Sequence, residues 1–500
     1  MTRGLLIAVL AAALPLTGCV VGPNYHRPQE PASASGSLKE AGGAGSSSAT
    51  AAGLDQWWRM YNDPVLDRLV REALTNNTDI RVAAANLAKA RAVLSAQRGA
   101  RLPTTNVSAQ YQREQSNSAS AAAFGGGGGN VQTFQFDLFQ LGFDASYEVD
   151  LFGGVTRAIQ AARGDTEAAA AELDASRVSV AAETARAYFS ACSNAAQLAV
   201  AKDNVDLQQK TLDLTNKLFT AGRETKADYE RADSLLAQAQ AQVPGFEAEQ
   251  RASLYALATL TGRPPEEVDA DASRCTAPPR LSQPVPAGDG AALIARRPDV
   301  RAAERTLAAD TARVGVAIAD LYPKITLMGN VNAYGTRGSQ LFQPSAVRYS
   351  FGPLISWTFP NQTQARARVR EARADADASL AKFDKAVLTA LTDSEQALAR
   401  YSGQLDRNAV LLRAESASSE AARLSRLRFD AGSDSFLQLI SAESTRVGAR
   451  AARAASDAAL ADAQISVFKA LGGGWEGAPK PERLAPDHAK DGAADSPAKP

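Results

Sequence analysis

The chain has 500 residues, and because its 54 basic and 54 acidic side chains balance, overall charge gives no indication of nucleic-acid binding. Hydrophobic residues make up 45% of the sequence but aromatic residues only 6%, which favours long, thin helices over thick globular cores. The two histidines are His26 and His488, and we recognise no metal-ligand cluster, phosphate loop or placed nucleophile. We therefore predict no catalytic residue, no metal site and no cofactor, so an enzyme is the disfavoured class.

The N-terminus has the pattern of an exported lipoprotein. Arg3 precedes an apolar run from Leu5 to Leu16, which is too short to cross a bilayer but suits a signal peptide over residues 1–18. The next residues, Leu16-Thr17-Gly18-Cys19, resemble a bacterial lipobox, which implies S-diacylglycerol and N-palmitoyl chains on Cys19. Val20 rather than Asp follows the cysteine, and this resemblance implies export to the outer membrane. An ordinary signal peptide with a chance cysteine is the alternative.

Residues 29–53 are rich in Ala, Ser and Gly, which predicts a flexible tether, so that residues 19–53 together form the lipidated N-terminus and its tether. A helical pattern begins at Leu54. A second helix is expected from about Asp79 to Arg101, capped by Thr78 or Asp79.

The hydrophobic period changes to two at four places, which predicts strands at about 104–115, 131–151, 324–335 and 346–359. Each pair of strands has an apolar and a polar face. A soluble sandwich would show the same alternation. A transmembrane barrel needs at least about eight strands, so one copy would leave open edges in lipid, whereas three copies would supply roughly twelve.

Two long helical hairpins are expected at 155–262 and 363–471. No proline interrupts the stretch from Val155 to Phe219, and apolar residues recur in it every seven positions along two stripes. Two stripes suit a helix with neighbours on both sides, as in a closed helical wall. A simple two-stranded coiled coil is the alternative.

The chain is internally duplicated. Phe219 and Phe429 are 210 residues apart, as are the glycines that follow the two hairpins, and Pro103 and Pro323 are 220 apart. Such a constant spacing is typical of a repeated unit. We predict one repeat over 54–275, a second over 276–475, and a disordered tail over 476–500.

Several segments carry a resemblance to a known family. They are Cys19-Val20-Val21-Gly22-Pro23-Asn24-Tyr25, Tyr147-Glu148-Val149-Asp150-Leu151-Phe152-Gly153-Gly154, Arg296-Arg297-Pro298-Asp299-Val300-Arg301-Ala302-Ala303-Glu304-Arg305, Tyr322-Pro323 and Phe468-Lys469-Ala470-Leu471-Gly472-Gly473-Gly474-Trp475. In these segments the chain resembles a TolC-like outer-membrane factor of the lipoprotein branch that serves resistance-nodulation-division (RND) efflux pumps.

The resemblance implies an α+β membrane protein that works as a homotrimer. Each protomer would add four transmembrane strands to a twelve-stranded barrel in outer-membrane lipid, and its long helices would form a coiled-coil barrel through the periplasm. The assembly would be a passive conduit for small molecules, docked to a periplasmic adaptor and an inner-membrane RND transporter. A conduit for type I protein secretion and a structural periplasmic coiled-coil lipoprotein remain the alternatives, and the sequence does not identify the exported substrate.

The resemblance also assigns roles to the two helical turns. The turns that contain Ala221, Gly222, Ala431 and Gly432 would be the periplasmic tips that meet the adaptor.

A periplasmic gate is expected just after the second turn. Leu437 fits the apolar ring of the family's gate, but Ser441 stands where an acidic residue is expected. Asp434, Glu443 and Arg446 are nearby charges that would either substitute for that acid or be solvated helix surface.

Two further cysteines, Cys192 and Cys275, would lie in the oxidising periplasm. They form either a disulfide bond or two separate thiols.

Overall fold

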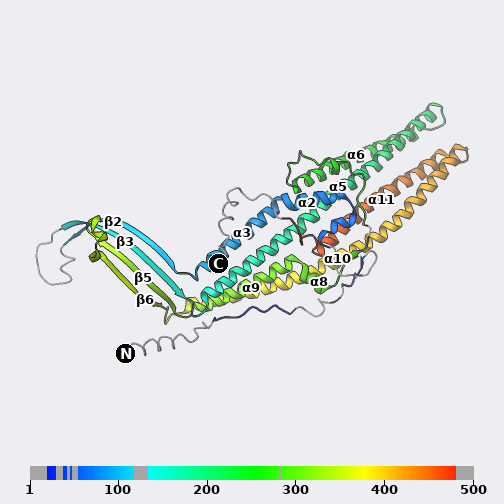
Figure 1. The fold of residues 1–500 in the computed structure, drawn as a ribbon. Coiled ribbons are helices and arrows are strands. Elements are labelled where there is room, and N and C mark those ends of the chain that lie inside the picture. Colours follow the sequence, from blue (N-terminus) through cyan, green and yellow to red (C-terminus); the bar gives the residue numbers. More distant parts are fainter. Residues whose placement is uncertain are drawn as a thin grey trace. The chain divides into compact units, whose positions relative to one another are not determined.

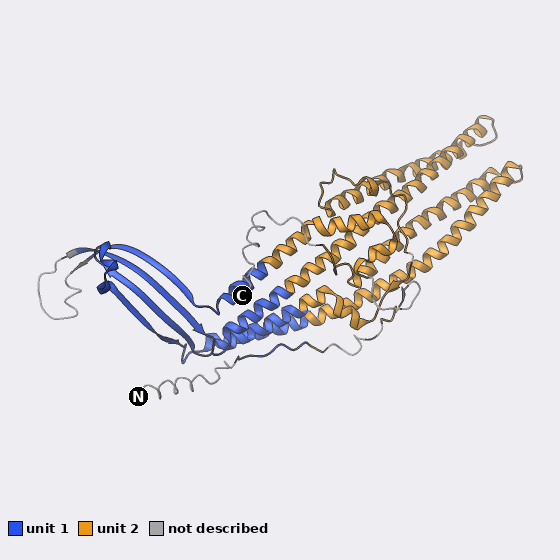
Figure 2. Ribbon diagram, viewed as in Figure 1, with its two compact units in different colours: residues 1–27, 89–167, 304–381 blue, residues 28–88, 168–303, 382–500 orange. Residues whose placement is uncertain are grey.

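The structure is a computed structural model that describes residues 20–29, 36, 38–41, 46–47, 54–117, 133–281 and 283–479. Two compact units compose it (Figure 2). Unit 1 contains residues 1–27, 89–167 and 304–381, and unit 2 contains residues 28–88, 168–303 and 382–500. The signal peptide, Cys19 and residues 480–500 of the predicted tail lie outside the described residues.

Unit 1 contains a four-stranded antiparallel sheet in the order β2-β3-β5-β6 (Figure 1). The strands are β2 (Thr104–Asn117), β3 (Thr133–Val149), β5 (Lys324–Gly335) and β6 (Val347–Ser356), close to the ranges that the alternating pattern predicts. Val107 lies opposite Phe143, and Phe143 lies opposite Val331. This register places the apolar positions of neighbouring strands on one common face, because successive side chains point to opposite faces.

Four long helices form two hairpins. They are α5 (Gly154–Thr220), α6 (Lys226–Leu260), α10 (Thr363–Asp430) and α11 (Phe436–Ala470). With 67 residues, α5 is about 100 Å long at ~1.5 Å per residue, and it continues from unit 1 into unit 2. No helix in the described part of the chain is both long and apolar enough to cross a bilayer.

Shorter elements precede the strands and follow the first hairpin. They are η2 (Leu54–Tyr61), α2 (Pro64–Asn76), α3 (Thr78–Gly99), α7 (Ala270–Ser273), α8 (Gly290–Arg296) and α9 (Pro298–Ala319). The prediction that Thr78 or Asp79 caps α3 is wrong. The Asn77 side chain accepts from the backbone N–H groups of Asp79 and Ile80, so the cap is one residue earlier than Thr78.

The core of unit 2 joins η2, at the start of the first repeat, to α11, at the end of the second. Trp57 of η2 stacks on Phe468 of α11 with ring centroids 4.7 Å apart, and both rings are fully buried. Tyr61 packs edge-on against Phe189 of α5. Burying an aromatic ring of this size contributes roughly 1.5–3 kcal/mol, so this cluster holds η2, α5 and α11 together.

The expectation of a flexible tether over residues 19–53 is wrong for the residues that the structure describes. Leu38 is buried, the backbone N–H of Lys39 donates to Glu395 at 2.7 Å, and β1 (Ser46–Ser47) pairs in parallel with β4 (Val285–Pro286). The composition of this segment indicates too little apolar surface to hold it in place. Leu38 and the backbone hydrogen bonds nevertheless hold the described residues between 38 and 47 against unit 2, because the rest of the unit supplies their partners.

Candidate functional site

Polar side chains cover one face of the sheet in unit 1. Asp144 lies opposite Asn330, Gln110 lies opposite Gln140, and Asn330 donates to Ser350 Oγ at 2.8 Å. Gly142 lies between Ser108 and Asn332, and a Cβ at Gly142 would come within 2.4 Å of Asn332 Oδ1. Hydrogen-bonding side chains therefore fill this face, and they present donors and acceptors that suit contact with water.

Apolar and aromatic side chains cover the opposite face and remain exposed. They include Val107, Tyr111, Leu141, Phe143, Val331, Tyr349, Phe351 and Ile355. An exposed apolar face of this extent normally marks a surface that contacts a membrane or another protein. The two edge strands, β2 and β6, each have a single partner in the sheet, so each offers an unpaired row of backbone N–H and C=O groups.

The two hairpin turns have the same geometry. Gly222 and Gly432 adopt φ angles of +73° and +75°, and the backbone N–H groups of Arg223 and Ser433 donate to the carbonyls of Leu218 and Arg428. Such a left-handed residue with a 6→1 hydrogen bond is a Schellman helix end. Ala221 and Ala431 precede the glycines, and all four residues are exposed. The structure therefore presents two matching small-residue turns.

The structure separates the three residues expected at the gate. Leu437 and Ser441 both lie on α11, one turn apart, and both are exposed, Leu437 by 67%. The Asp434 side chain is only 7% exposed, because it forms an ion pair with Arg428 at 2.9 Å and accepts from Ser425. Asp434 is therefore part of the turn itself.

Glu443 is buried between α10 and α11. Arg446 and Arg426 donate to its carboxylate at 2.7 Å and 3.0 Å. Burial alone would raise the pKa of Glu443, but the hydrogen bonds from the two arginines lower that pKa below its ordinary value. Arg426 of α10 and Glu443 of α11 therefore link the two helices of the hairpin, and Arg446 of α11 holds the same carboxylate from within its own helix.

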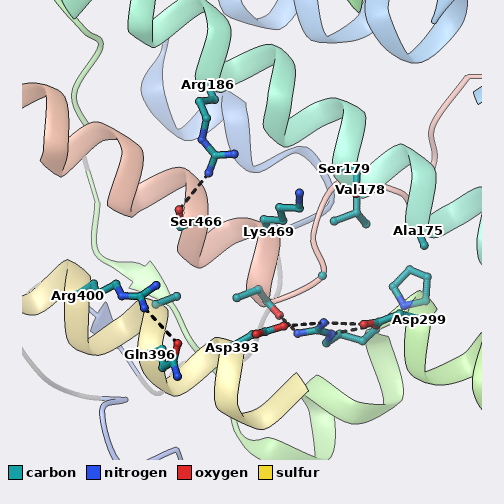
Figure 3. Close-up of a pocket in the computed structure, with 15 residues that line it drawn as sticks. Ala175, Val178, Ser179, Arg186, Asp299, Asp393, Gln396, Arg400, Ser466 and Lys469 are labelled. Carbon is teal, nitrogen blue, oxygen red and sulfur yellow. Dashed lines mark hydrogen bonds and ion pairs between the residues drawn. The ribbon is translucent and has the colours of Figure 1, made fainter. Parts of the chain in front are cut away.

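A cavity of about 300 Å³ lies between α5, the start of α9, α10 and α11 in unit 2 (Figure 3). Arg297, just before α9, is 8% exposed and lines this cavity. Its guanidinium donates to Asp299 at 2.6 Å, to Asp393 at 3.3 Å, and to the carbonyl of Ala470 at 3.1 Å. The sequence marked Arg297 only as part of a motif, and its contacts show a structural role at the end of α11.

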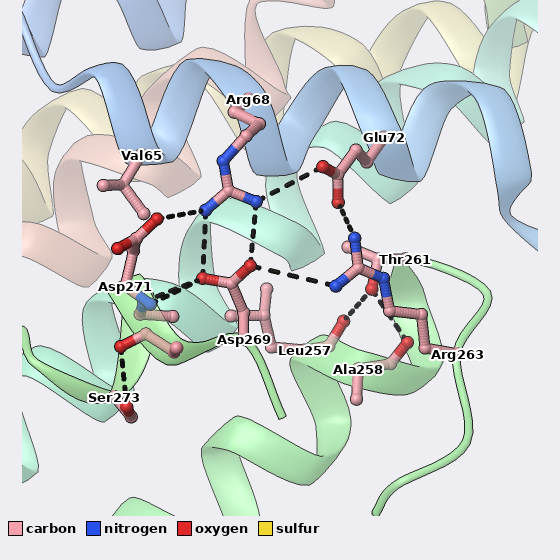
Figure 4. A network of polar contacts seen from close by, with 12 residues as sticks. Val65, Arg68, Glu72, Leu257, Ala258, Thr261, Arg263, Asp269, Asp271 and Ser273 are labelled. Carbon is pink, nitrogen blue, oxygen red and sulfur yellow. Dashed lines mark hydrogen bonds and ion pairs between the residues drawn. The ribbon is translucent and has the colours of Figure 1, made fainter. Parts of the chain in front are cut away.

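A second polar network joins α2 to the segment after α6 (Figure 4). Both terminal nitrogens of Arg68 donate to Asp269, at 2.8 Å and 3.0 Å, while Arg263 donates to Glu72 at 2.7 Å. The hydrogen bonds from Arg68 hold the pKa of Asp269 below its ordinary value. The network fixes the first hairpin to α2.

Residues 69–263 and 291–473 match the profile of a family described as outer membrane efflux protein. The chain is 30% identical over 475 residues to outer membrane protein OprJ of Pseudomonas aeruginosa, covering 94% of this chain and 96% of OprJ. The chain belongs to the outer membrane efflux protein family. Nodulation protein T of Rhizobium leguminosarum bv. trifolii is 29% identical over 86% of this chain and 89% of its own length. The solved outer-membrane channel OprN matches with a TM-score of 0.83 and 35% identity, over 91% of this chain and all of OprN.

The family match and the similarity to solved channels confirm four predictions about this protein. The resemblance to TolC-like factors is correct, and so is the α+β TolC-like fold. The protein is an outer-membrane component of efflux with a channel role, and it extends into the periplasm. The family is one of conduits rather than enzymes.

The segment that follows Cys19 is seated against the helices of unit 1. Arg157 of α5 is buried and donates to the carbonyls of Val21 and Gly22, both at 3.0 Å, and to Asn24 Oδ1 at 2.9 Å. Further along, Tyr25 donates to Glu304 at 3.1 Å, and burial together with this carboxylate raises the pKa of Tyr25 to about 12. We call Val20–Arg27 the strap. The sequence does not indicate this role of Arg157. Two of its acceptors are backbone carbonyls, which every residue type supplies, so the residues of the strap show no pattern that would identify them as its partners.

The two remaining cysteines lie close together in unit 2. A disulfide joins Cys192 of α5 to Cys275, which follows α7, with the Cα atoms 5.0 Å apart. Cys192 is buried within the core cluster.

Proposed function

We propose that three copies of this chain assemble into a passive conduit in the outer membrane, which carries small molecules from a periplasmic adaptor and an inner-membrane RND transporter to the exterior. The sheet is the observation that carries this proposal. It has one polar face, one exposed apolar face and two open edges. Unpaired strand edges are not tolerated in lipid, so β2 of one copy must pair with β6 of the next, and three copies supply twelve strands.

The polar face of the sheet would then line the lumen and the apolar face would meet lipid. Rings of Asn, Gln and Ser side chains offer water both donors and acceptors, but no deep pocket for one substrate. The conduit would therefore select little among small molecules, and the inner-membrane transporter would set the choice. The chain itself would perform no covalent chemistry.

The two turns would dock the adaptor. Ala221, Gly222, Ala431 and Gly432 form matching exposed ends, and small residues let a partner helix approach the backbone closely. Because the two turns have the same geometry, three copies would present six similar docking positions.

The start of α11 would form the entrance constriction. Leu437 is exposed next to the turn, and Ser441 follows it on the same helix face. Asp434 forms an ion pair with Arg428 of its own chain, so the constriction would be an apolar ring without an adjoining acidic ring.

Substitution of the exposed leucine tests this constriction. Leu437→Ser should raise single-channel conductance. Leu424→Ser, at another exposed leucine near the second turn, is the matched control and should leave conductance unchanged.

Lipid on Cys19 would add a second membrane attachment. The strap brings Val20 against Gly153, four residues after the end of β3. The acylated cysteine would therefore lie close to the end of the sheet. The diacylglycerol and palmitoyl chains would hold the N-terminus in the outer membrane, and the apolar face of the sheet would be a separate contact with the same lipid.

Conductance in planar bilayers, with native mass measured on the same detergent-extracted sample, tests the proposal. We expect a trimer with discrete conductance steps. If the wild-type chain and Leu437→Ser are both monomers or dimers, and neither gives discrete conductance steps, the result would favour a structural coiled-coil lipoprotein.

A further inference from the structure

Three arginines lie on one face of α10, at the start of the helix in unit 1. Arg366, Arg370 and Arg373 are spaced at i, i+4 and i+7, so their side chains follow one line along the helix surface. All three are exposed, and among the described residues none of them forms an ion pair or a side-chain hydrogen bond. We call these three residues the arginine stripe.

An exposed aromatic pair links β6 to the start of α10. Trp357 and Phe359 stack with ring centroids 4.7 Å apart, and they are 50% and 67% exposed. Trp357 and Gln362 both donate to the carbonyl of Leu321, so the same backbone group holds the aromatic pair and the residue before α10. Aromatic rings at the end of a lipid-facing strand lie at the level of the lipid headgroups. The arginine stripe spans ~10 Å just beyond them, so it covers the headgroup layer and the adjacent water.

The internal repeat indicates which side of the helical wall the stripe faces. A shift of 210 residues aligns the ends of α5 with those of α10 to within one residue. Gln160 of α5 corresponds to Arg370. Arg163 of α5 corresponds to Arg373. Both α5 residues line a cavity of about 370 Å³ beside the strap. The strap begins next to Cys19, whose lipid chains would lie in the outer membrane, so it runs along the outside of the wall. The stripe therefore also faces outward.

The fold itself does not require these arginines. Two of their three counterparts in α5, Thr156 and Gln160, carry no charge. The third, Arg163, forms an ion pair with Glu167 at 3.0 Å. The first half of the chain therefore builds the same helix start without a row of three arginines. The charges of the stripe are available to a partner outside the chain.

We propose that the arginine stripe binds the phosphate groups of anionic phospholipids in the periplasmic leaflet of the outer membrane. The planar guanidinium group suits this ligand, because its N–H groups can donate to two phosphate oxygens at once. Basic side chains beside a bilayer attract anionic lipids, and each contributes a factor of about five in affinity. The inference rests on the proposed outer-membrane conduit and adds the class of lipid that the wall of this conduit recognises.

Native mass spectrometry of the detergent-purified protein tests the inference, because it reports the oligomeric state and the number of bound lipids together. The protein is titrated with phosphatidylglycerol and, separately, with phosphatidylethanolamine. Arg370→Gln should bind phosphatidylglycerol about fivefold more weakly than the wild type. The variant with all three arginines of the stripe replaced by glutamine should bind it about a hundredfold more weakly. Binding of the zwitterionic lipid should change less than threefold in either variant.

Arg368→Gln is the matched control. Arg368 is equally exposed and lies two residues from Arg370, but at 100° per residue it points about 160° away around the helix. Its replacement removes the same charge at the same depth and should leave phosphatidylglycerol binding unchanged. Arg370→Lys keeps the charge and should therefore lose less affinity than Arg370→Gln.

Two results would overturn the inference. One is phosphatidylglycerol binding that is the same in the wild type and in the variant without the stripe, and the other is an equal loss in Arg368→Gln and Arg370→Gln. If the wild type is then still a trimer with discrete conductance steps, the proposed function stands without this lipid contact. A wild-type monomer without conductance steps would overturn the proposed function, whichever lipid it binds.

Discussion

Asn77 and Arg297 make the same contact in the two halves of the chain. Asn77 Nδ2 donates to the carbonyl of Leu260 at 3.0 Å, and Arg297 Nη1 donates to the carbonyl of Ala470 at 3.1 Å. The two donors are 220 residues apart and the two acceptors 210. In each half, the residue before the helix that leads to the strands binds the last carbonyl of the returning hairpin, where helix carbonyls lack internal partners.

Replacing Arg297 should destabilise the protein more than replacing Asn77. Arg297→Gln removes a buried charge that also holds Asp299 and Asp393, and we expect a loss of about 2–4 kcal/mol. Asn77→Ala removes one hydrogen bond and a helix cap, which costs about 1–2 kcal/mol. Thermal unfolding in detergent measures the difference. Arg400→Gln, an exposed site beside the same cavity, is the control, and an equal loss there would contradict the role of Arg297.

The contact between the strap and Arg157 should require glycine at position 22. Its φ is +87°, and a Cβ at this position would lie 2.5 Å from the Cα of Gly315. Gly22→Ala should therefore release the strap from Arg157, and hydrogen exchange of residues 20–27 should accelerate at least tenfold while the strands exchange as before. Gly99→Ala has open space around it and should change nothing. Unaltered exchange in Gly22→Ala would show that the strap is held elsewhere.

The sequence predicts the repeated and periodic parts of this structure well, because they depend on patterns many residues long. Strand β5 and the ends of both hairpins follow directly from alternation, heptads and duplication. Contacts that depend on one side chain and a distant backbone are not encoded locally. The cap at Asn77, the hold of Arg157 on Val21 and Gly22, and the burial of Leu38 all belong to this kind.

The Cys192–Cys275 disulfide should form in the exported protein. It closes a loop of 83 residues, and the loss of chain entropy in the unfolded state predicts a stabilisation of about 4.5 kcal/mol. Reduction should raise the intact mass by two hydrogens and lower the melting temperature. The variant with both cysteines replaced by serine should match the reduced wild type and no longer respond to reductant. Free thiols at both positions in the non-reduced protein would exclude the bond.

The network around Asp269 should give the first hairpin a defined acid sensitivity. Because hydrogen bonds from Arg68 lower the pKa of Asp269 in the folded chain below the ordinary 3.8, the unfolded chain binds this proton more readily. The carboxylate therefore stabilises the fold above about pH 4, and this contribution is lost as the pH falls through the lower, folded pKa. Asp269→Asn should cost about 1 kcal/mol at pH 7, allowing for partial solvent screening.

The difference between wild type and Asp269→Asn should then shrink below about pH 4, as the wild-type carboxylate becomes protonated. Thermal unfolding between pH 3 and pH 7 follows this change. Asp271→Asn is the matched control, because Asp271 contacts the same arginine at 3.2 Å but is half exposed, and its effect should be smaller at every pH. If the difference in stability between wild type and Asp269→Asn stays constant from pH 3 to pH 7, the Asp269 carboxylate stabilises the hairpin by its shape and not by its charge.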